Sequence, residues 1–459
     1  MKKTALFLAV MILASAILSS SLAVDTLYQS GKISTVKHFR IFTPYSNDLT
    51  NGKPLIIFFA ANEQGDINRV LWFVNKYRIY DDYDINLMCV SSAGTVSQAG
   101  WEVIAEELAD YLKPEYEKQP FDIIIDCVGN GGYAGCCLAE ALMDRKMTPR
   151  ELNLGDGADA KLVTADWLKW FAGNGTQVNL YASGSAAAGI SAGSRKVMEE
   201  LDGTDRFHGE TIGNIKSAEV LWRAISEHGL HSEYTCWDVM KLQRYKAQNG
   251  TVINYCAYIP EAGNTAEKLP MLIYFHGIRD TMGKLRGLGQ LLRTNQLKPN
   301  GIVILPQAVR GTVDADFHTK KYQDAVIELV YGIAGEYNGD TNRLSVAGHS
   351  DGGTTVYQIV NSHPGVFAAC APVSGVGNDG KGIRQTELWV FQGAKDSWVK
   401  PEIGLRTVLK CESAGCRARH YVYKDEGHEI QTRVFQDTFT DENGNKVRLI
   451  DWLMSKELN

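Results

Sequence analysis

The chain has 459 residues, of which 44% are hydrophobic and 22% charged, and its formal net charge is −6. This composition is that of a globular protein, which excludes a disordered chain, and the length suits two domains of ordinary size. No run of Lys and Arg occurs, so the sequence argues against nucleic acid or an anionic membrane surface as a partner.

The first 23 residues have the pattern of a secretory signal peptide. Lys2 and Lys3 precede an apolar run over residues 5–18, and small residues follow up to Ala23. The apolar run is short for a membrane span, and no later segment approaches that length. We therefore predict a secreted, extracellular protein that is cleaved near Ala23 and has no membrane span after cleavage.

The N-terminal half repeats a pattern of the C-terminal half. Residues 35–44 align with residues 251–260, and without a gap residues 54–59 align with residues 270–275. Self-similarity on this scale indicates two tandem copies of one domain rather than a short-period solenoid.

We predict a first domain over residues 24–228 and a second over residues 229–459. Both are of the α/β class, each a mostly parallel sheet flanked by helices, because strand and helix patterns alternate. In the second domain the predicted strands lie near residues 251–259, 270–275, 301–305, 343–348, 367–373, 387–392 and 419–424. Its predicted helices lie near residues 284–296, 318–337, 352–362, 401–412 and 447–456.

Residues 344–356 carry the most informative motif, in which an apolar run ends in Gly-His-Ser-Asp-Gly and a helix pattern follows. This is the sequence form of a nucleophile elbow, where a strand meets a helix in a tight turn. Gly348 and Gly352 are expected there because a Cβ at either position would clash across the turn. Ser350 would stand at the helix N-terminus, where backbone N–H groups favour developing negative charge.

Three further motifs each follow a predicted strand. They are His276-Gly277, Asp396 and His428. In open α/β sheets the carboxyl ends of the strands form the edge where active sites lie. The Ser, the Asp and the His also occur in the chain order of the α/β-hydrolases.

The second domain therefore resembles an α/β-hydrolase of the esterase type, similar to the polyhydroxybutyrate-depolymerase and feruloyl-esterase branch. The resemblance implies that Ser350 is the nucleophile, that His428 is the general base and then acid, and that Asp396 orients His428. The chemistry needs these residue types, because a serine hydroxyl is a weak nucleophile until an imidazole takes its proton. The backbone N–H groups of Ile278 and Asp351 would form the oxyanion hole.

Other residues near these motifs have different expected roles. Asp425 and Glu426 precede the triad histidine, but Asp396 is preferred because it follows a strand at the family's spacing. His276 and His349 are interpreted as turn and packing residues rather than catalysts. Support of the elbow and of the oxyanion loop is assigned to His276, Gly277, Gly348, His349 and Gly352.

No cofactor or metal is implied. The nine cysteines lack metal spacing such as C-x-x-C, and the ten histidines do not cluster. Cys411 and Cys416 could close a small loop in an exported protein.

The catalytic residues are missing from the first domain. We place Ala60 and Ala61 at its oxyanion loop, Gly131 at the nucleophile, Ala187 at the carboxylate and Glu210 at the histidine. Without a hydroxyl, an acid and a base this copy is predicted to be non-catalytic. It would pack against its twin, which is the favoured role, or bind substrate.

These features predict a secreted serine esterase that hydrolyses carboxylic esters through an acyl-enzyme. Feruloyl or acetyl groups on polysaccharide, or a polyester, are the substrates that the resemblance implies, so the substrate can be polymeric. A serine peptidase of the same fold and a non-catalytic binding protein are the alternatives. The oligomeric state cannot be predicted from the sequence.

Overall fold

The computed structural model describes most of the chain. The described residues are 32–36, 39–43, 49, 52–59, 74, 85–92, 97–158, 161–183, 190–212, 217–228, 240–260, 267–278, 280, 285–309, 315–377, 382–383 and 386–458. They form two compact units, one within residues 1–230 and one within residues 231–459. The predicted signal peptide lies outside the described residues.

The N-terminal unit alternates strands and helices. Its strands are β1 (Lys32–Val36), β2 (Phe39–Thr43), β3 (Leu55–Phe59), β4 (Asn86–Ser92), β5 (Ile123–Val128), β6 (Glu151–Gly155), β7 (Gln177–Ser183) and β8 (Phe207–Ile212). Its helices are α3 (Gln98–Lys118), α4 (Gly131–Asp144), α5 (Ala165–Gly173), α6 (Ile190–Leu201) and α7 (Ser217–His228).

The C-terminal unit follows the same plan. Its strands are β9 (Met240–Lys246), β10 (Val252–Tyr258), β11 (Leu269–Phe275), β12 (Ile302–Pro306), β13 (Gly339–His349), β14 (Ala369–Val373), β15 (Glu387–Gly393), β16 (Ala418–Tyr423), β17 (Thr438–Thr440) and β18 (Lys446–Arg448). Its helices are α8 (Leu288–Arg293), α9 (Lys320–Glu336), α10 (Asp351–Ser362), α11 (Pro401–Ser413), α12 (Gln431–Gln436) and α13 (Leu449–Ser455).

The two large sheets have the same strand order. It is β1-β2-β4-β3-β5-β6-β7-β8 in the N-terminal unit and β9-β10-β12-β11-β13-β14-β15-β16 in the C-terminal unit. In each sheet the first two pairings are antiparallel and the other five are parallel. This is the predicted α/β architecture with a mostly parallel sheet.

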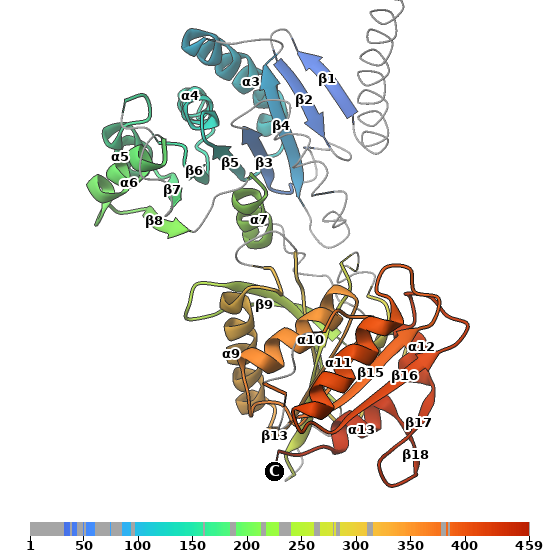
Figure 1. Ribbon diagram of the computed structural model, residues 1–459. Helices are drawn as coiled ribbons and strands as arrows, with labels where there is room; N and C mark the ends of the chain where they lie inside the picture. The colour runs from blue at the N-terminus through green and yellow to red at the C-terminus, as the bar shows by residue number, and fades with distance from the viewer. Residues whose placement is uncertain are drawn as a thin grey trace, which may run out of the picture. The chain divides into compact units, whose positions relative to one another are not determined.

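Helices cover both faces of each sheet (Figure 1). In the C-terminal unit α10 packs against β11, β13 and β14 on one face, and α13 packs against the same strands on the other. In the N-terminal unit α4 and α7 pack in the same way against β3, β5 and β6. The central strands are therefore buried on both faces, which is why they read as continuous apolar runs in the sequence.

The aromatic core of the C-terminal unit lies between the sheet and α13. Trp389 of β15 stacks on Trp452 of α13 with ring centroids 3.9 Å apart, and Phe391 stacks on Tyr421 of β16 at 5.1 Å. This packing fixes the carboxyl ends of β15 and β16, from which the loops that carry Asp396 and His428 begin.

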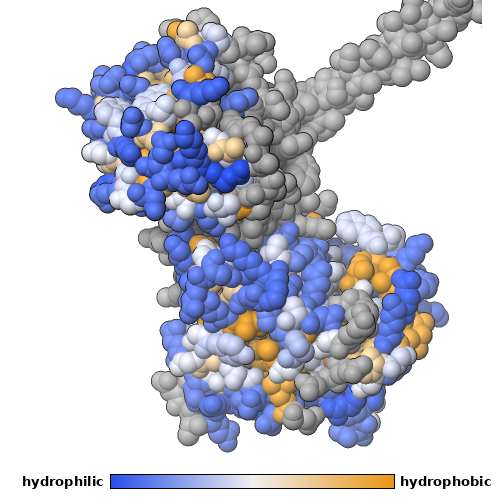
Figure 2. Space-filling view, turned by 60° about the vertical axis from the view of Figure 1, so that its left-hand side comes forward, coloured by the Kyte–Doolittle hydropathy of each residue, from blue (hydrophilic) through white to orange (hydrophobic). Residues whose placement is uncertain are grey.

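No helix within the described residues is long and apolar enough to cross a membrane. The face of the C-terminal unit seen in Figure 2 is mostly hydrophilic, with several separate apolar patches.

Candidate active site

The turn from β13 into α10 has the geometry of a nucleophile elbow. Ser350 sits at the N-cap of α10 with φ 56° and ψ −112°, a backbone conformation that side chains rarely adopt. A Cβ on Gly352 would lie 2.2 Å from the carbonyl oxygen of Phe275, and one on Gly348 would lie 2.5 Å from that of Gly352. The predicted clash across the turn is thereby confirmed for Gly348, whereas the clash at Gly352 is with the end of the neighbouring strand β11.

The structure brings Ser350, His428 and Asp396 together. His428 Nε2 lies 2.8 Å from Ser350 Oγ, and His428 Nδ1 lies 2.8 Å from Asp396 Oδ2. The side chain of Asp396 is fully buried and that of His428 is 9% exposed. A proton can therefore pass from the hydroxyl to the imidazole while a dry carboxylate faces the opposite nitrogen.

Backbone groups hold Asp396 in this position. Its Oδ1 accepts hydrogen bonds from the N–H groups of Trp398 at 2.8 Å and Val399 at 2.9 Å. The loops that carry the Asp and the His touch where β15 ends, because a Cβ on Gly393 would lie 2.0 Å from the carbonyl oxygen of Gly427. Only glycine permits that approach.

The backbone of His428 is also fixed. Its carbonyl oxygen accepts hydrogen bonds from Ser374 Oγ at 2.9 Å and from His349 Nε2 at 3.0 Å. Burial lowers the pKa of His349 to about 4, so this imidazole is neutral and its one N–H is the Nε2 donor. His349 is therefore a positioning residue, a more specific role than packing. Ser374 was missed at the sequence level, although it stands just past β14.

The predicted oxyanion loop follows β11. Ala308 donates its N–H to His276 Nε2 at 3.0 Å, so the ring proton lies on Nδ1, which donates to the carbonyl oxygen of Gly277 at 2.7 Å. The N–H of Asp280 donates to the same oxygen at 3.0 Å. Two donors thus fix the peptide between Gly277 and Ile278, and its trans geometry directs the Ile278 N–H away from both. Burial lowers the pKa of His276, which keeps the ring neutral.

An ion-pair chain links this loop to the histidine loop. Arg286 Nε donates to Asp280 Oδ1 at 2.5 Å, and Arg286 Nη1 pairs with Glu429, the residue after His428. The side chain of Asp280 is 1% exposed, so its charge depends on Arg286 for compensation. The arginine therefore holds together the two loops that border Ser350.

Asp351, the predicted second oxyanion donor, is the first residue of α10. Its side chain pairs with His318, with Nε2 and Oδ1 3.1 Å apart. Burial opposes protonation of His318, but the pairing with Asp351 outweighs it and raises the pKa of the imidazole. The Asp351 side chain thus contacts an imidazole outside the triad.

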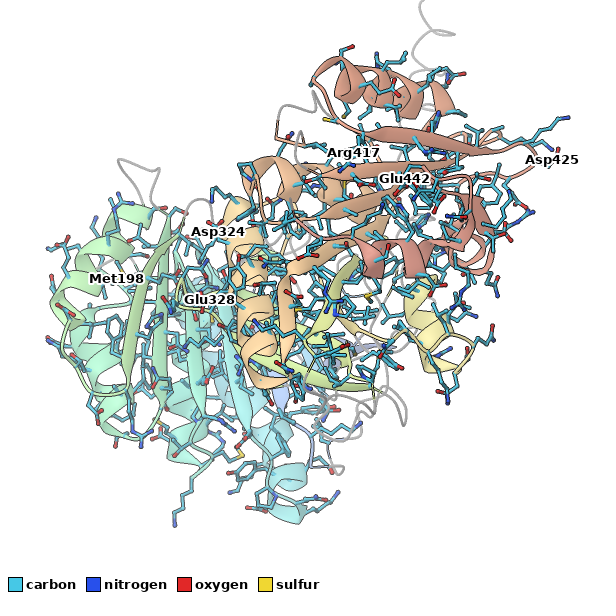
Figure 3. All side chains as sticks on the ribbon, turned by 90° about the horizontal axis from the view of Figure 1, so that it is seen from below. Met198, Asp324, Glu328, Arg417, Asp425 and Glu442 are labelled. Carbon is cyan, nitrogen blue, oxygen red and sulfur yellow. The ribbon has the colours of Figure 1, made fainter. Side chains whose placement is uncertain are left out.

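The two acids that precede His428 point elsewhere. Asp425 extends outward at the tip of the loop after β16 (Figure 3), where its side chain is 79% exposed and pairs with Lys395 at 3.2 Å. Glu426 pairs with Arg433. Neither carboxylate contacts the imidazole, as the preference for Asp396 requires.

The equivalent edge of the sheet in the N-terminal unit shows that the predicted match of Gly131 to Ser350 is wrong. Gly129 has φ 55° and donates its N–H to the carbonyl oxygen of Gly155 at the end of β6, at 2.9 Å. Ser350 has φ 56° and donates to Val373 at the end of β14, at 2.8 Å. Gly129, and not Gly131 as predicted, therefore occupies the position of Ser350. Gly131 is already the first residue of α4.

The predicted equivalent of His428 is also wrong. Glu210 lies inside β8, whereas His428 follows the end of β16 by five residues. Its carboxylate pairs with Arg223 of α7 at 2.7 Å. Ala60, Ala61 and Ala187 lie outside the described residues.

Part of the C-terminal unit matches a protein family. Residues 248–403 match a family described as "Putative esterase". The C-terminal unit thus matches an esterase family. The matched segment contains the oxyanion loop, Ser350 and Asp396, and it ends before His428. No curated protein matches the sequence.

Several solved structures are similar in fold. A thermostable esterase has 23% identity and a TM-score of 0.40, over 48% of this chain and 64% of its own. The acylaminoacyl peptidase of Pyrococcus horikoshii has 12% identity and a TM-score of 0.35, over 43% and 39%. A ferulic acid esterase has 16% identity and a TM-score of 0.33, over 43% and 94%. The chain spans less than two thirds of the length of the first two.

Proposed function

We propose that the protein is a secreted serine esterase whose C-terminal unit hydrolyses carboxylic esters at Ser350. The observation that carries the proposal is the pair of 2.8 Å contacts that link Ser350 Oγ, the two ring nitrogens of His428 and Asp396 Oδ2. The match of residues 248–403 to an esterase family supports the reaction class. The signal-peptide pattern of residues 1–23 supports export.

The proposed reaction has two steps, acylation of Ser350 and hydrolysis of the acyl-enzyme. Ser350 Oγ attacks the ester carbonyl carbon as His428 Nε2 takes its proton, and the carbonyl oxygen becomes an oxyanion facing the N–H groups of Ile278 and Asp351. His428 then gives the proton to the leaving alcohol, and an acyl-Ser350 ester remains. A water molecule, deprotonated by His428, releases the acid and restores the hydroxyl.

We also propose that the N-terminal unit is a non-catalytic copy of the same domain. The common strand order and the equivalent turns at Gly129 and Ser350 support a shared origin. A glycine at the elbow has no hydroxyl with which to form an acyl-enzyme. The favoured role of this unit is structural.

The test is ester turnover by the purified full chain with a panel of acetyl, feruloyl and hydroxyalkanoate esters, together with an anilide as the amide counterpart. Ser350→Ala should lower kcat by about 10⁴–10⁶-fold on every substrate, because triad members act as one unit. A fluorophosphonate should label the wild type at Ser350 only. Turnover by Ser350→Ala close to that of the wild type would exclude the proposal, and faster anilide than ester cleavage would favour a peptidase.

A further inference from the structure

The loop between β15 and α11 carries a tryptophan that the triad chemistry does not use. Trp398 is 67% exposed, more than any other large hydrophobic side chain within the described residues. Single exposed apolar side chains are common on protein surfaces, so exposure alone identifies no site. Trp398 is a candidate ligand surface because it lies against His428, and covering its indole would be favourable.

Trp398 lies against the triad. Its ring centroid is 5.2 Å from that of His428, at an interplanar angle of 35°. Its backbone N–H donates to Asp396 Oδ1 at 2.8 Å, and Val399 donates to the same oxygen. The buried carboxylate therefore fixes the backbone that presents the indole, and one imidazole ring separates the indole from Ser350 Oγ.

The position of His428 indicates whether the acyl half or the alcohol half of an ester would contact this indole. His428 Nε2 must hand its proton to the leaving oxygen, so the leaving alcohol lies beside the imidazole. The proposed oxyanion donors belong to other segments, the loop after β11 and the first residue of α10. The indole packs on the imidazole and is thus a neighbour of the alcohol half.

Building on the proposed esterase function, we propose that Trp398 is a binding platform for the alcohol half of the substrate and that it stacks on a sugar ring bearing the ester. One face of a pyranose presents C–H groups that suit an indole, while its hydroxyls stay in water. An indole left two-thirds open fits such a half-hydrated ligand, whereas a wholly apolar alcohol requires an enclosed pocket.

The test compares acetate esters that share one acyl group, namely an acetylated methyl xylopyranoside, phenyl acetate and butyl acetate. Trp398→Ala should lower kcat/KM for the sugar ester at least tenfold more than for butyl acetate, mainly through KM, and Trp398→Phe should recover most of the loss. Leu409→Ala is the matched control, because Leu409 is also an exposed apolar side chain, 53% exposed on α11. It should produce no such difference.

Three results would overturn the proposal. Equal losses on all three esters with a shifted pH profile would mean that the indole only positions His428. A larger loss on phenyl acetate than on the sugar ester would assign the platform to an aromatic alcohol, and equal activity of variant and wild type would leave it no role.

Failure of the esterase function itself is a separate outcome. If the wild type hydrolyses none of the esters, binding of an acetylated xylo-oligosaccharide to Ser350→Ala and to Ser350→Ala/Trp398→Ala is measured by calorimetry. At least tenfold weaker binding by the double variant would support the platform, and equal binding or none would overturn it.

Discussion

A single methyl group at Gly393 should separate the two loops of the triad. The Cβ of Gly393→Ala would lie 2.0 Å from the carbonyl oxygen of Gly427 and 2.5 Å from that of Glu426, whereas real Cβ contacts do not fall below 3.0 Å. The loops must therefore move apart by about 1 Å, and the 2.8 Å contact between His428 and Asp396 cannot survive that shift unchanged.

Two reference values bound the loss of activity. A misplacement of 1 Å costs about 10²-fold in rate, and loss of the orienting carboxylate costs about 10⁴-fold. We expect Gly393→Ala to lower kcat by about 10²–10⁴-fold with a smaller change in KM, since the substrate contacts remain. Steady-state turnover of a short-chain ester measures both constants, and circular dichroism with a thermal scan checks the fold.

Gly427→Ala is the matched control. The nearest atom to its Cβ would be the carbonyl oxygen of Lys395, an ordinary contact at 3.8 Å. This variant should stay within about threefold of the wild type, because no loop has to move. If both variants kept wild-type activity, or if both lost it to the same extent, the close contact of the two loops at Gly393 would not be what sets the triad geometry.

Three further perturbations follow from other parts of the structure. Gly129→Ser in a Ser350→Ala background should restore neither turnover nor fluorophosphonate labelling; labelling at the new serine would contradict the non-catalytic assignment. Arg286→Gln should lower the free energy of unfolding by about 1–3 kcal/mol, because it leaves the buried Asp280 carboxylate without its ion-pair partner. It should also lower kcat about tenfold, because the predicted oxyanion loop is held less firmly. An unchanged free energy of unfolding and an unchanged kcat would show that these ion pairs contribute to neither. Burial raises the pKa of the Asp126 carboxyl in β5. The stabilisation that comes from its bound proton is fully present below the ordinary carboxyl pKa, and it is lost as pH rises through the raised pKa. The stability of Asp126→Asn relative to wild type, from amide hydrogen exchange in the N-terminal unit, should therefore increase with pH, and a constant difference would contradict the sign.

The sequence predicted the strands whose residues are mostly buried and missed several short or polar elements. The strands β10–β15 were predicted within a few residues, because their buried residues form continuous apolar runs. The edge strand β16 was also predicted, although its residues are only partly buried. Strand β9 was missed because its sequence contains Lys241, Arg244 and Lys246 and lacks the apolar run of a buried strand. The short strands β17 and β18 and helix α12 were missed because three to six residues carry too little periodic signal.

Residue types at strand ends predicted which side chains would meet, but not the contacts that hold them. The link from His349 to the His428 carbonyl joins residues 79 positions apart and depends on backbone that no local pattern reveals. The error at Gly131 has a similar cause. Three glycines within residues 129–132 suit a tight turn equally well, and only the backbone conformation identifies Gly129 as the elbow residue.

The elbow also suggests how stability and activity compete in this fold. The conformation of Ser350 costs a non-glycine residue about 1–3 kcal/mol, and glycine adopts it without that penalty. Under the proposed mechanism, the strained turn of the C-terminal unit places the attacking hydroxyl. In the N-terminal unit the corresponding turn carries Gly129 with φ 55°, so the position that lacks a hydroxyl also lacks this strain. The turn of the N-terminal unit is thus the less strained form of the elbow.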